Sequence, residues 1–479
     1  MATRYSVANG NWNATSTWSA SSGGSSGASV PATGDRAIIE GGFTVTLTGD
    51  TTTGGCDIDG GGSAGTLVGG GYTLTCDGDG SGTTFDHDGN ISGHLDVVLN
   101  GAADNTSRNL DLGGGGTQIR NLTCNNANTT WTLINNAVSL TGNLTITAGT
   151  LNTGSDIALT VAGDVDIATA GTLTTNASAV TVGAISATGN GTYNATTHAN
   201  GTIINSRHSS LGRGLSMGSV DRLVHNNGKI VFQGASAIQL ILINGTATSS
   251  VGLYDVEINS TAAADCKLTG AIDIYRNLTI TAGELDTNSS DNYALTVDGD
   301  VSIASGGELT GNASAISLGS LTIESGGTYS ATSGTTTITD QAGSGYAFRE
   351  LGTFTHNNGT MKFTDTGSHP YVQGSSFYNL EVALAASTLE FRWEDSGGSL
   401  VTIDNDLTIT RGRFKFNTAG DSITVHGLTK LESDGQFGLG SPSGTHAFNG
   451  LVTLNGGTWY LSSGTNNMAG IRNVGGTIS

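Results

Sequence analysis

A short acidic stretch of the sequence has the spacing of a calcium-binding loop. It reads Asp77-Gly-Asp79-Gly-Ser81-Gly82, and Asp88 stands eleven residues after its first aspartate. Calcium loops place oxygen ligands at positions 1, 3, 5, 7 and 12, around a glycine at position 6. Here a serine occupies position 5, an aspartate replaces the usual glutamate at position 12, and the flanking segments have β character. A Gly-Asp corner of a β structure has the same composition. We favour the corner and keep calcium as the alternative.

Paired carboxylates could cleave a glycosidic bond if one acted as acid and the other as base or nucleophile. The candidate carboxylates lie in the second half of the chain, and they are Glu284, Asp286, Glu308, Glu394 and Asp395. Glu284 and Asp286 are two apart, which places both on one face of a strand. The corresponding positions of an earlier repeat carry no acid, and they are Thr150, Asn152 and Thr172. We therefore interpret these acids as solvated surface.

Other chemical motifs are not recognisable in the sequence. We find no Ser, His and Asp arrangement and no His/Cys set with metal-ligand spacing. The run Gly113-Gly-Gly-Gly116 lacks the Lys and Ser/Thr of a phosphate-binding loop. His225 and His356 recur before Asn-Asn-Gly and are predicted to be turn residues. We accordingly predict no catalytic, cofactor-binding or metal-binding residue.

The four cysteines allow two interpretations. Cys56 and Cys76 lie twenty residues apart and could form a disulfide if successive coils stack them. Nothing else in the sequence suggests a disulfide framework, so free thiols in a reducing compartment are the favoured alternative.

The composition predicts an ordered, polar β protein. Of 479 residues, 75 are Gly, 36% are hydrophobic and only 12% are charged, whereas disordered chains combine few apolar residues with high charge. The net charge of −21 and the lack of a Lys/Arg cluster argue against nucleic-acid binding. No segment is long and apolar enough for membrane insertion, and the first residues predict no secretory signal.

An internal repeat organises the chain. NLTITAG stands at residues 143–149 and again at 277–283, and DLTITRG follows at 406–412. Such self-similarity is typical of solenoids. It predicts a solenoid that begins with a cap or attachment segment containing the first strands (1–55) and continues with the first coils (56–117). Three modules follow, at 118–251, 252–375 and 376–479, and the last of them is incomplete.

A shorter spacing within the modules indicates the fold. Ala158-Leu-Thr-Val161 is echoed by Ala179-Val-Thr-Val182, 21 residues later. About three short alternating segments per repeat, separated by Gly, Asn and Asp, predict an all-β parallel β-helix with coils of about 20 residues. A right-handed coil is the usual form. At roughly 4.8 Å per coil, some twenty coils would extend on the order of 100 Å. The alternative is an array of antiparallel β-sandwiches, which would show hairpin spacing instead.

The N-terminal segment contains Trp12 and Trp18, which are predicted to cover the open end of the first coil. The alternative is a carbohydrate-stacking platform. The surrounding pattern, GNWNATSTWSASSGGSSGASVPATGD, resembles the opening of many bacteriophage virion proteins, tail-fibre-like or other particle-surface proteins with β-helical bodies. The resemblance implies a protein made in the host cytoplasm and carried on the virion surface. It also implies other virion proteins as partners, a possible homotrimer and a possible host-surface glycan as ligand.

The expected function is therefore structural: a fibre, spike or capsid-surface appendage that acts as a rigid spacer and contact surface, without enzymatic activity. Two alternatives stay open, a tailspike that degrades host polysaccharide and an adhesin that binds glycans without cleaving them. At the other end the third module stops part-way. We expect either that another protein covers its last coil or that the native chain continues.

Overall fold

The fold is an all-β parallel solenoid, as the sequence predicts. In the computed structural model 55% of residues lie in strands, which form about 18 turns of roughly 23 residues each. The structure describes residues 1–101, 107–113, 119–206, 208–234, 239–260, 266–343, 345–365, 367, 369–374, 376–394, 399–440, 443–461 and 463–479. Among these, helical structure is limited to two 3-10 turns, η1 (Thr15–Thr17) and η2 (Val220–Arg222). No helix in this part of the chain has the length and apolar character needed to span a bilayer.

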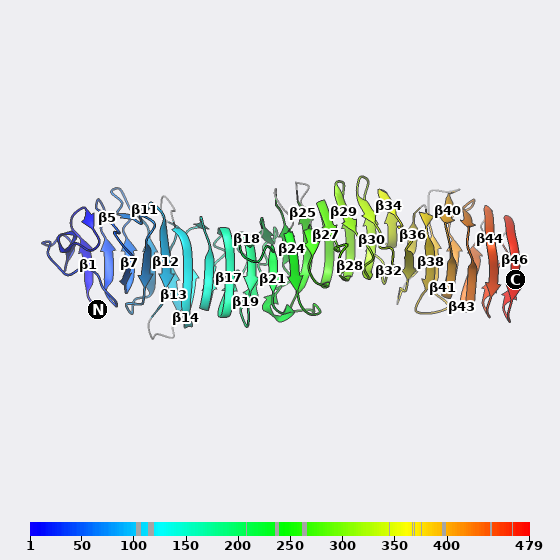
Figure 1. The fold of residues 1–479 in the computed structure, drawn as a ribbon, viewed down its shortest axis with the longest axis horizontal. Coiled ribbons are helices and arrows are strands. Elements are labelled where there is room, and N and C mark those ends of the chain that lie inside the picture. The colour runs from blue at the N-terminus through cyan, green and yellow to red at the C-terminus, as the bar shows by residue number, and fades with distance from the viewer. Residues whose placement is uncertain are drawn as a thin grey trace. The chain divides into compact units, whose positions relative to one another are not determined.

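The chain divides into two compact units. Unit 1 consists of Met1–Gln233 and Gln239–Gly252, and the larger part of unit 2 is Leu253–Ser479. The division lies next to the predicted module boundary at 251/252, whereas the predicted boundary at 375/376 falls inside unit 2. Figure 1 labels the strands of both units.

Three ladders of parallel strands build unit 1. The first ladder contains β4 (Arg36–Ile39), β7 (Gly55–Ile58), β10 (Thr83–His87), β13 (Ser107–Leu110), β14 (Ile119–Leu133), β16 (Leu144–Asn152), β17 (Leu159–Thr174), β19 (Thr192–Asn194) and β22 (Leu223–Val224). The second contains β6 (Thr51–Thr53), β9 (Thr73–Cys76), β12 (Leu95–Leu99), β14, β16, β17, β18 (Val180–Ala187), β21 (Leu215–Met217) and β24 (Gln239–Ile243). The third has two runs, β2 (Gly10–Asn11), β5 (Thr44–Thr46), β8 (Thr66–Val68) and β11 (Asn90–Ser92), then β15 (Val138–Leu140), β17, β18, β20 (Thr202–Ile204) and β23 (Lys229–Phe232). Each strand pairs with its counterpart one coil away, so the ladders satisfy the backbone groups of the coil.

Unit 2 repeats this plan. β25 (Leu253–Asn259) and β26 (Cys266–Leu268) pair with β27 (Ile272–Asp286). One ladder then contains β27, β28 (Leu295–Ile303), β30 (Ile316–Ile323), β32 (Thr335–Ile338), β35 (Thr360–Phe363), β38 (Asn379–Ala383), β41 (Leu407–Phe416), β43 (Thr429–Gly440), β44 (Thr445–Leu454) and β46 (Thr465–Asn473). A second contains β27, β28, β30, β33 (Tyr346–Glu350), β36 (Tyr371–Gln373), β39 (Glu390–Trp393), β41, β43, β45 (Thr458–Trp459) and β47 (Thr477–Ile478). The third side has two runs, β27, β29 (Gly307–Thr310), β31 (Thr328–Ser330) and β34 (Thr353–Thr355), then β37 (Ser376–Phe377), β40 (Leu400–Ile403), β42 (Ser422–Val425), β44 and β46.

The sequence repeat and the coil are out of phase in unit 2. The second NLTITAG copy places residues 278–280 in the ladder of β33 and β36. The third copy places residues 407–409 in the ladder of β35 and β38 instead. A module of about 128 residues is not a whole number of roughly 23-residue coils, so equivalent strands appear on different sides.

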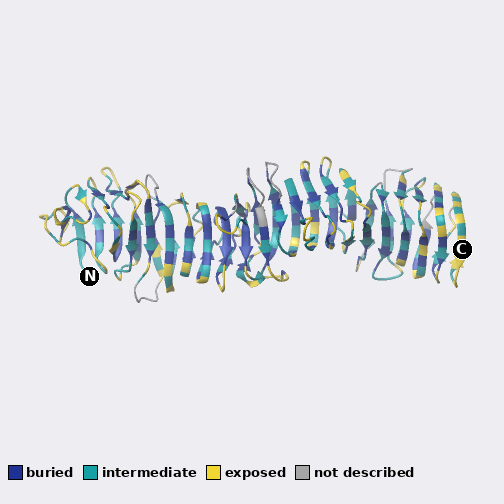
Figure 2. Ribbon diagram, viewed as in Figure 1, coloured by how far each residue is buried: buried dark blue, intermediate teal, exposed yellow. Residues whose placement is uncertain are grey.

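Side-chain alternation fills the interior. Along β12 the burial alternates strictly, with Leu95, Val97 and Leu99 buried between outward Asp96 and Val98. Figure 2 shows this alternation along the strands of both units. Successive strand residues point to opposite faces, so the apolar set stacks inside the coil and the Thr and Ser set stays outside. Few strand pairs depart from the parallel rule among the described residues: β1 (Thr3–Ser6) with β3 (Trp18–Ser19), and an isolated Val224–Val251 bridge. The sandwich alternative is therefore wrong.

Trp12 and Trp18 are buried in the N-terminal segment. Their exposed fractions are 3% and 0%, their ring centroids are 5.1 Å apart, and the Trp18 indole donates a hydrogen bond to the Trp12 carbonyl (2.7 Å). The backbone N–H of Trp12 binds the carbonyl of Thr46 in β5. Rings buried in this way cannot stack on a sugar, so the carbohydrate-platform alternative is wrong for this pair.

Candidate functional site

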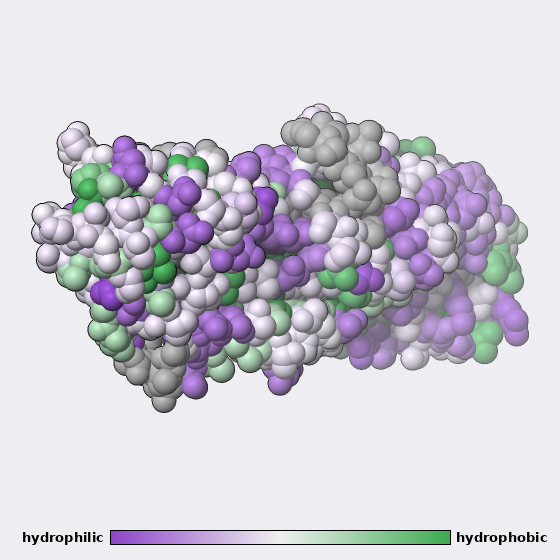
Figure 3. All heavy atoms as spheres, turned by 60° about the vertical axis from the view of Figure 1, so that its left-hand side comes forward, coloured by the Kyte–Doolittle hydropathy of each residue, from purple (hydrophilic) through white to green (hydrophobic). Residues whose placement is uncertain are grey.

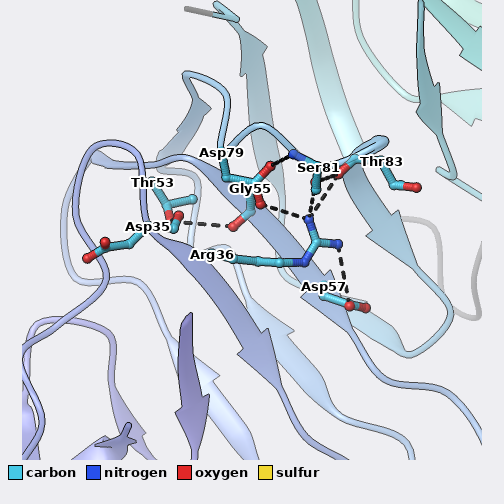
Figure 4. A network of polar contacts seen from close by, with 8 residues as sticks. All are labelled: Asp35, Arg36, Thr53, Gly55, Asp57, Asp79, Ser81 and Thr83. Carbon is cyan, nitrogen blue, oxygen red and sulfur yellow. Dashed lines mark hydrogen bonds and ion pairs between the residues drawn. The ribbon is translucent and has the colours of Figure 1, made fainter. Parts of the chain in front are cut away.

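Arg36 fills the acidic loop that the sequence analysis considered for calcium. This residue begins β4, and its Nη1 lies 3.0 Å from Asp79 Oδ2, 2.9 Å from Ser81 Oγ and 3.0 Å from the Thr83 carbonyl. Figure 4 shows the guanidinium directed into the loop. Counted from Asp77, these three groups are positions 3, 5 and 7, which are the calcium-ligand positions. The loop thus uses its oxygen atoms to bind a guanidinium.

The rest of the loop is also engaged by protein groups. Asp77 Oδ1 accepts a hydrogen bond from the Gly34 N–H (3.1 Å), and the Arg36 Nη2 lies 3.5 Å from Asp57 Oδ2. Burial alone raises the pKa of the Asp79 carboxyl, but hydrogen bonds from Ser81 and Arg36 outweigh burial and hold that pKa below its usual value. A metal ion does not fit this loop while Arg36 occupies it, so the structure favours the corner interpretation.

A carboxylate cluster lies beside the Arg36 network. Asp86 in β10 is in register with Asp57 in β7. Oxygen atoms of Asp86, Asp88 and Asp111 lie within 4.8 Å of one another. Burial, followed by the charges of Asp57, Asp88 and Asp111, raises the pKa of Asp86 to about 6. Three such carboxylates are close enough to share one cation.

Asp111 already has protein partners within this cluster. It is fully buried, and its carboxylate accepts hydrogen bonds from the Gly113 N–H (3.1 Å) and the Asn135 side chain (2.5 Å). Asp111 therefore also serves as a structural corner residue.

The structure brings together a Ser, a His and an Asp that the sequence analysis did not recognise. His208 Nε2 lies 2.8 Å from Asp166 Oδ1, and His208 Nδ1 lies 3.1 Å from Ser210 Oγ. His208 is 6% exposed and Ser210 is exposed. The expectation that no such arrangement exists was wrong, because Asp166 is 42 residues from His208 in sequence.

The hydrogen bonds around His208 favour a turn over a nucleophile. The backbone N–H groups of Ser210 and Leu211 both point at Nδ1, each at 3.2 Å. Nδ1 is therefore the unprotonated nitrogen, and Nε2 donates its proton to Asp166. If Nδ1 took up the serine proton, it would lose both hydrogen bonds from the backbone N–H groups, which opposes general-base catalysis. Asp164 Oδ2 lies 3.8 Å from Nδ1, beyond hydrogen-bond distance.

The predicted turn histidines behave in the same way. His225 Nδ1 accepts the Asn227 N–H (2.8 Å), and His356 Nδ1 accepts the Asn358 N–H (3.2 Å). The imidazole of each closes a tight turn two residues on, and this explains why His stands before Asn-Asn-Gly in both modules.

Of the candidate carboxylates for glycoside cleavage, the structure places Glu284 beside Glu308 and engages Asp286 with other residues. Glu284 is in register with Glu308 on the next coil. Asp286 is 9% exposed, and its carboxylate contacts Lys267 Nζ (3.0 Å) and the Asn312 side chain (2.7 Å). Burial opposes ionisation of Asp286, but hydrogen bonds from Lys267 and Asn312 lower its pKa overall. Asp286 therefore stabilises a coil corner.

The remaining candidate residues from the sequence are either partly exposed, buried or outside the described residues. Glu394 is partly exposed after the fully buried Trp393, whereas Asp395 and residues 114–116 of the glycine run lie outside the described residues. All four cysteines are free and buried. Burial raises the pKa of the Cys76 thiol to about 12, so this thiol is unreactive at neutral pH.

No protein-family model, curated protein or solved structure matches this chain. Its function is therefore inferred from the fold and from the geometry of its surface.

Proposed function

We propose that the chain is a structural protein of a virion surface: a fibre, spike or capsid-surface appendage that acts as a rigid spacer and presents a contact surface. The observation that carries the proposal is the coil-to-coil ladder found in each unit. In the described parts of each unit, neighbouring coils are hydrogen-bonded through parallel strands, and Asn and Asp side chains bind backbone groups between several of these coils. Such a repeat resists bending because no coil can move without breaking several hydrogen bonds at once.

The N-terminal pattern supports the location. Residues 10–35 resemble the opening of particle-surface proteins, and in the structure this segment packs onto the first coils through Trp12 and Trp18. Its partners would be other virion proteins. A homotrimer, the usual arrangement of phage fibres, is the assembly to test by mass photometry of the purified chain.

The surface chemistry is compatible with exposure to water. The face drawn in Figure 3 is mostly polar, with apolar side chains in small separate areas. The net charge of −21 favours solubility and opposes unspecific association of copies.

The two alternatives differ in what they require. A polysaccharide-degrading tailspike needs two carboxylates held for catalysis. Asp286 is bound to Lys267, which leaves Glu284 and Glu308, in register on neighbouring strands, as its candidates. A glycan-binding adhesin needs only an outward surface with suitable donors and acceptors. The neighbouring residues Tyr371 and Arg392 of unit 2 offer such groups.

The proposal is tested on virus particles purified from cells that make this chain. Quantitative mass spectrometry of gradient-purified particles is expected to find the chain at a fixed copy number, and brief trypsin treatment of intact particles is expected to leave its solenoid undigested. Recovery of the chain only in the soluble fraction would overturn the proposal. Reducing ends released from host polysaccharide by the purified chain, and lost in Glu308→Gln, would favour the tailspike.

A further inference from the structure

One outward surface of unit 2 collects tyrosines and cations from four successive coils. Tyr346 in β33 is in register with Tyr371 in β36, Tyr371 with Arg392 in β39, and Arg392 with Lys415 in β41. Arg413 is in register with Glu390 beside this column. We call it the Tyr-Arg surface, and it comprises Tyr346, Arg349, Tyr371, Arg392, Arg413 and Lys415.

Two guanidinium groups lie over the tyrosine rings. The two rings lie 6.2 Å apart between centroids. The Arg349 guanidinium lies 5.1 Å from the Tyr346 ring centroid, and that of Arg392 lies 5.4 Å from the Tyr371 centroid. Arg392 Nη1 also donates a hydrogen bond to the Tyr371 hydroxyl (2.8 Å). Cation-π contacts of this kind order long side chains before any ligand arrives, which reduces the entropy cost of binding.

A carboxylate sits among the cations and completes a mixed set of donors and acceptors. Glu390 Oε2 lies 2.8 Å from Arg392 Nη2 and 3.4 Å from Lys415 Nζ. Partial burial opposes ionisation of Glu390, but Arg392 and Lys415 lower its pKa overall, so it is an anionic acceptor. Arg413 Nε is buried and has no hydrogen-bond partner among the described residues.

Basic residues are more frequent here than in the chain as a whole. Among the described residues, the four cations of this surface lie near the carboxylates Glu350, Glu390 and Glu394, whereas the whole chain has 39 acidic residues and 18 basic ones. The inward residues beneath the column are Phe348, Val372, Trp393 and Phe416, all buried, so the surface stands on a packed core.

We infer that the Tyr-Arg surface binds an acidic glycan, a sugar chain that carries both carboxylates and hydroxyls. Guanidinium groups positioned by neighbouring rings bind planar carboxylates through two hydrogen bonds. Glu390 accepts hydrogen bonds from hydroxyls, a role that a phosphate backbone would not use. With strands about 4.8 Å apart, the step from β33 to β41 covers roughly 15 Å, enough for a few sugars. Single-stranded nucleic acid is disfavoured, because its affinity depends on many phosphate contacts without opposing acids.

An acidic glycan would be the ligand of the contact surface proposed for the virion protein, so the biological meaning of this binding rests on the proposed function. The binding itself is tested on the purified full-length chain, so its failure leaves the particle-location test intact. The probes are tetragalacturonic acid, a hyaluronan tetrasaccharide, fully methyl-esterified tetragalacturonate as the neutral match, and a ten-residue oligothymidylate, all measured by isothermal titration calorimetry.

The expected result is binding of at least one acidic oligosaccharide that weakens with added salt and is lost with the methyl ester. The Arg392→Gln/Lys415→Gln variant should bind it at least ten-fold more weakly, and Arg349→Gln, which lies outside the Glu390 ion pairs, several-fold. Arg276→Gln is the matched control and should bind normally. Arg276 also stacks on a tyrosine, at 5.4 Å from the Tyr254 centroid, but pairs with Asp255 and stands apart from the column.

The inference would be overturned by no binding of either acidic probe at millimolar concentration, by equal binding of the methyl ester, or by tighter binding of oligothymidylate. An equal loss in Arg276→Gln would do the same. Thermal melting of each variant accompanies the titrations, and Arg349→Gln keeps the test valid if the double variant does not fold.

Discussion

The side-chain oxygen of Asn143 accepts a hydrogen bond from the backbone N–H of Asp164, one coil further along the chain (2.9 Å). The equivalent residues of the other two repeat copies do the same. Asn277 accepts from the Asp300 N–H (3.0 Å), and Asp406 from the Leu428 N–H (2.7 Å). The first residue of each repeat copy thus binds a backbone donor of the next coil with its side chain, directly before the ladder pairs Leu144–Val165, Leu278–Val301 and Leu407–Thr429.

Replacing Asn143 by Ala is expected to reduce the free energy of unfolding by about 1 kcal/mol, because the Asp164 N–H loses its acceptor in a partly buried position. Asn143→Asp should keep most of the stability, since the third repeat copy uses Asp in this role. Equilibrium denaturation of the full chain measures both. Equal losses in the two variants would argue against this role.

The last residue of the repeat is glycine for a conformational reason. Gly149, Gly283 and Gly412 have φ values of +83°, +81° and +102°. At Gly149 an added Cβ would also collide with the carbonyl oxygens of Asn126 and Thr129. Gly149→Ala is therefore expected to cost more than about 2 kcal/mol.

Gly306 provides the control for this change. Its φ is +86°, but an added Cβ would meet nothing within 4 Å. Gly306→Ala should cost only the conformational strain, on the order of 1 kcal/mol. Thermal melts in which both alanine variants lose the same stability would contradict the steric explanation.

Arg36→Ala is expected to destabilise unit 1 by about 3 kcal/mol, because it leaves the partly buried Asp57 and Asp79 without their shared cation. Arg36→Lys should recover only part of this loss, since an ammonium cannot make the same planar set of contacts. Arg276→Ala, whose side chain is 52% exposed and pairs with Asp255, should cost less than about 1 kcal/mol. Denaturant titration of the three variants measures their free energies of unfolding. A loss in Arg36→Ala no larger than the loss in Arg276→Ala would refute the prediction.

The stability of unit 1 is expected to depend on the protonation of Asp86. Its folded pKa of about 6 lies above the unfolded value near 3.9, so the folded state binds the proton more tightly. The stabilisation from this group is complete below about pH 4 and is lost as the pH rises through 6. Asp86→Asn should therefore melt at a higher temperature than the wild type at pH 7.5 and at the same temperature near pH 4. A variant that is less stable at pH 7.5 would show that the ionised carboxylate is needed there.

The ladders could be predicted from the sequence because they follow from local patterns. Alternation such as Leu159-Thr160-Val161 sets one inward face, and recurrence after about twenty residues sets the coil. The observed coil is longer, about 23 residues on average, because some connections are long, as between Ile185 and its partner Leu215 on the next coil. Because the connections differ in length, the sequence alone does not show which residues of successive coils are in register.

The sites could not be predicted for the same reason. Arg36 reaches Asp79 across 43 residues, and His208 reaches Asp166 across 42, which are separations of about two coils. The Tyr371–Arg392 neighbours are 21 residues apart. With the register known, isolated basic residues in the sequence become a cluster. The expectation that no Lys/Arg cluster exists was therefore wrong for this surface.

The account's main proposal, a spacer carried on a virion surface, is tested most directly by cryo-electron microscopy of purified particles labelled with a Fab raised against unit 2. We predict Fab density outside the particle, at a constant distance from its shell or tail. Particles that carry no Fab, although the same Fab binds the purified chain, would contradict the account.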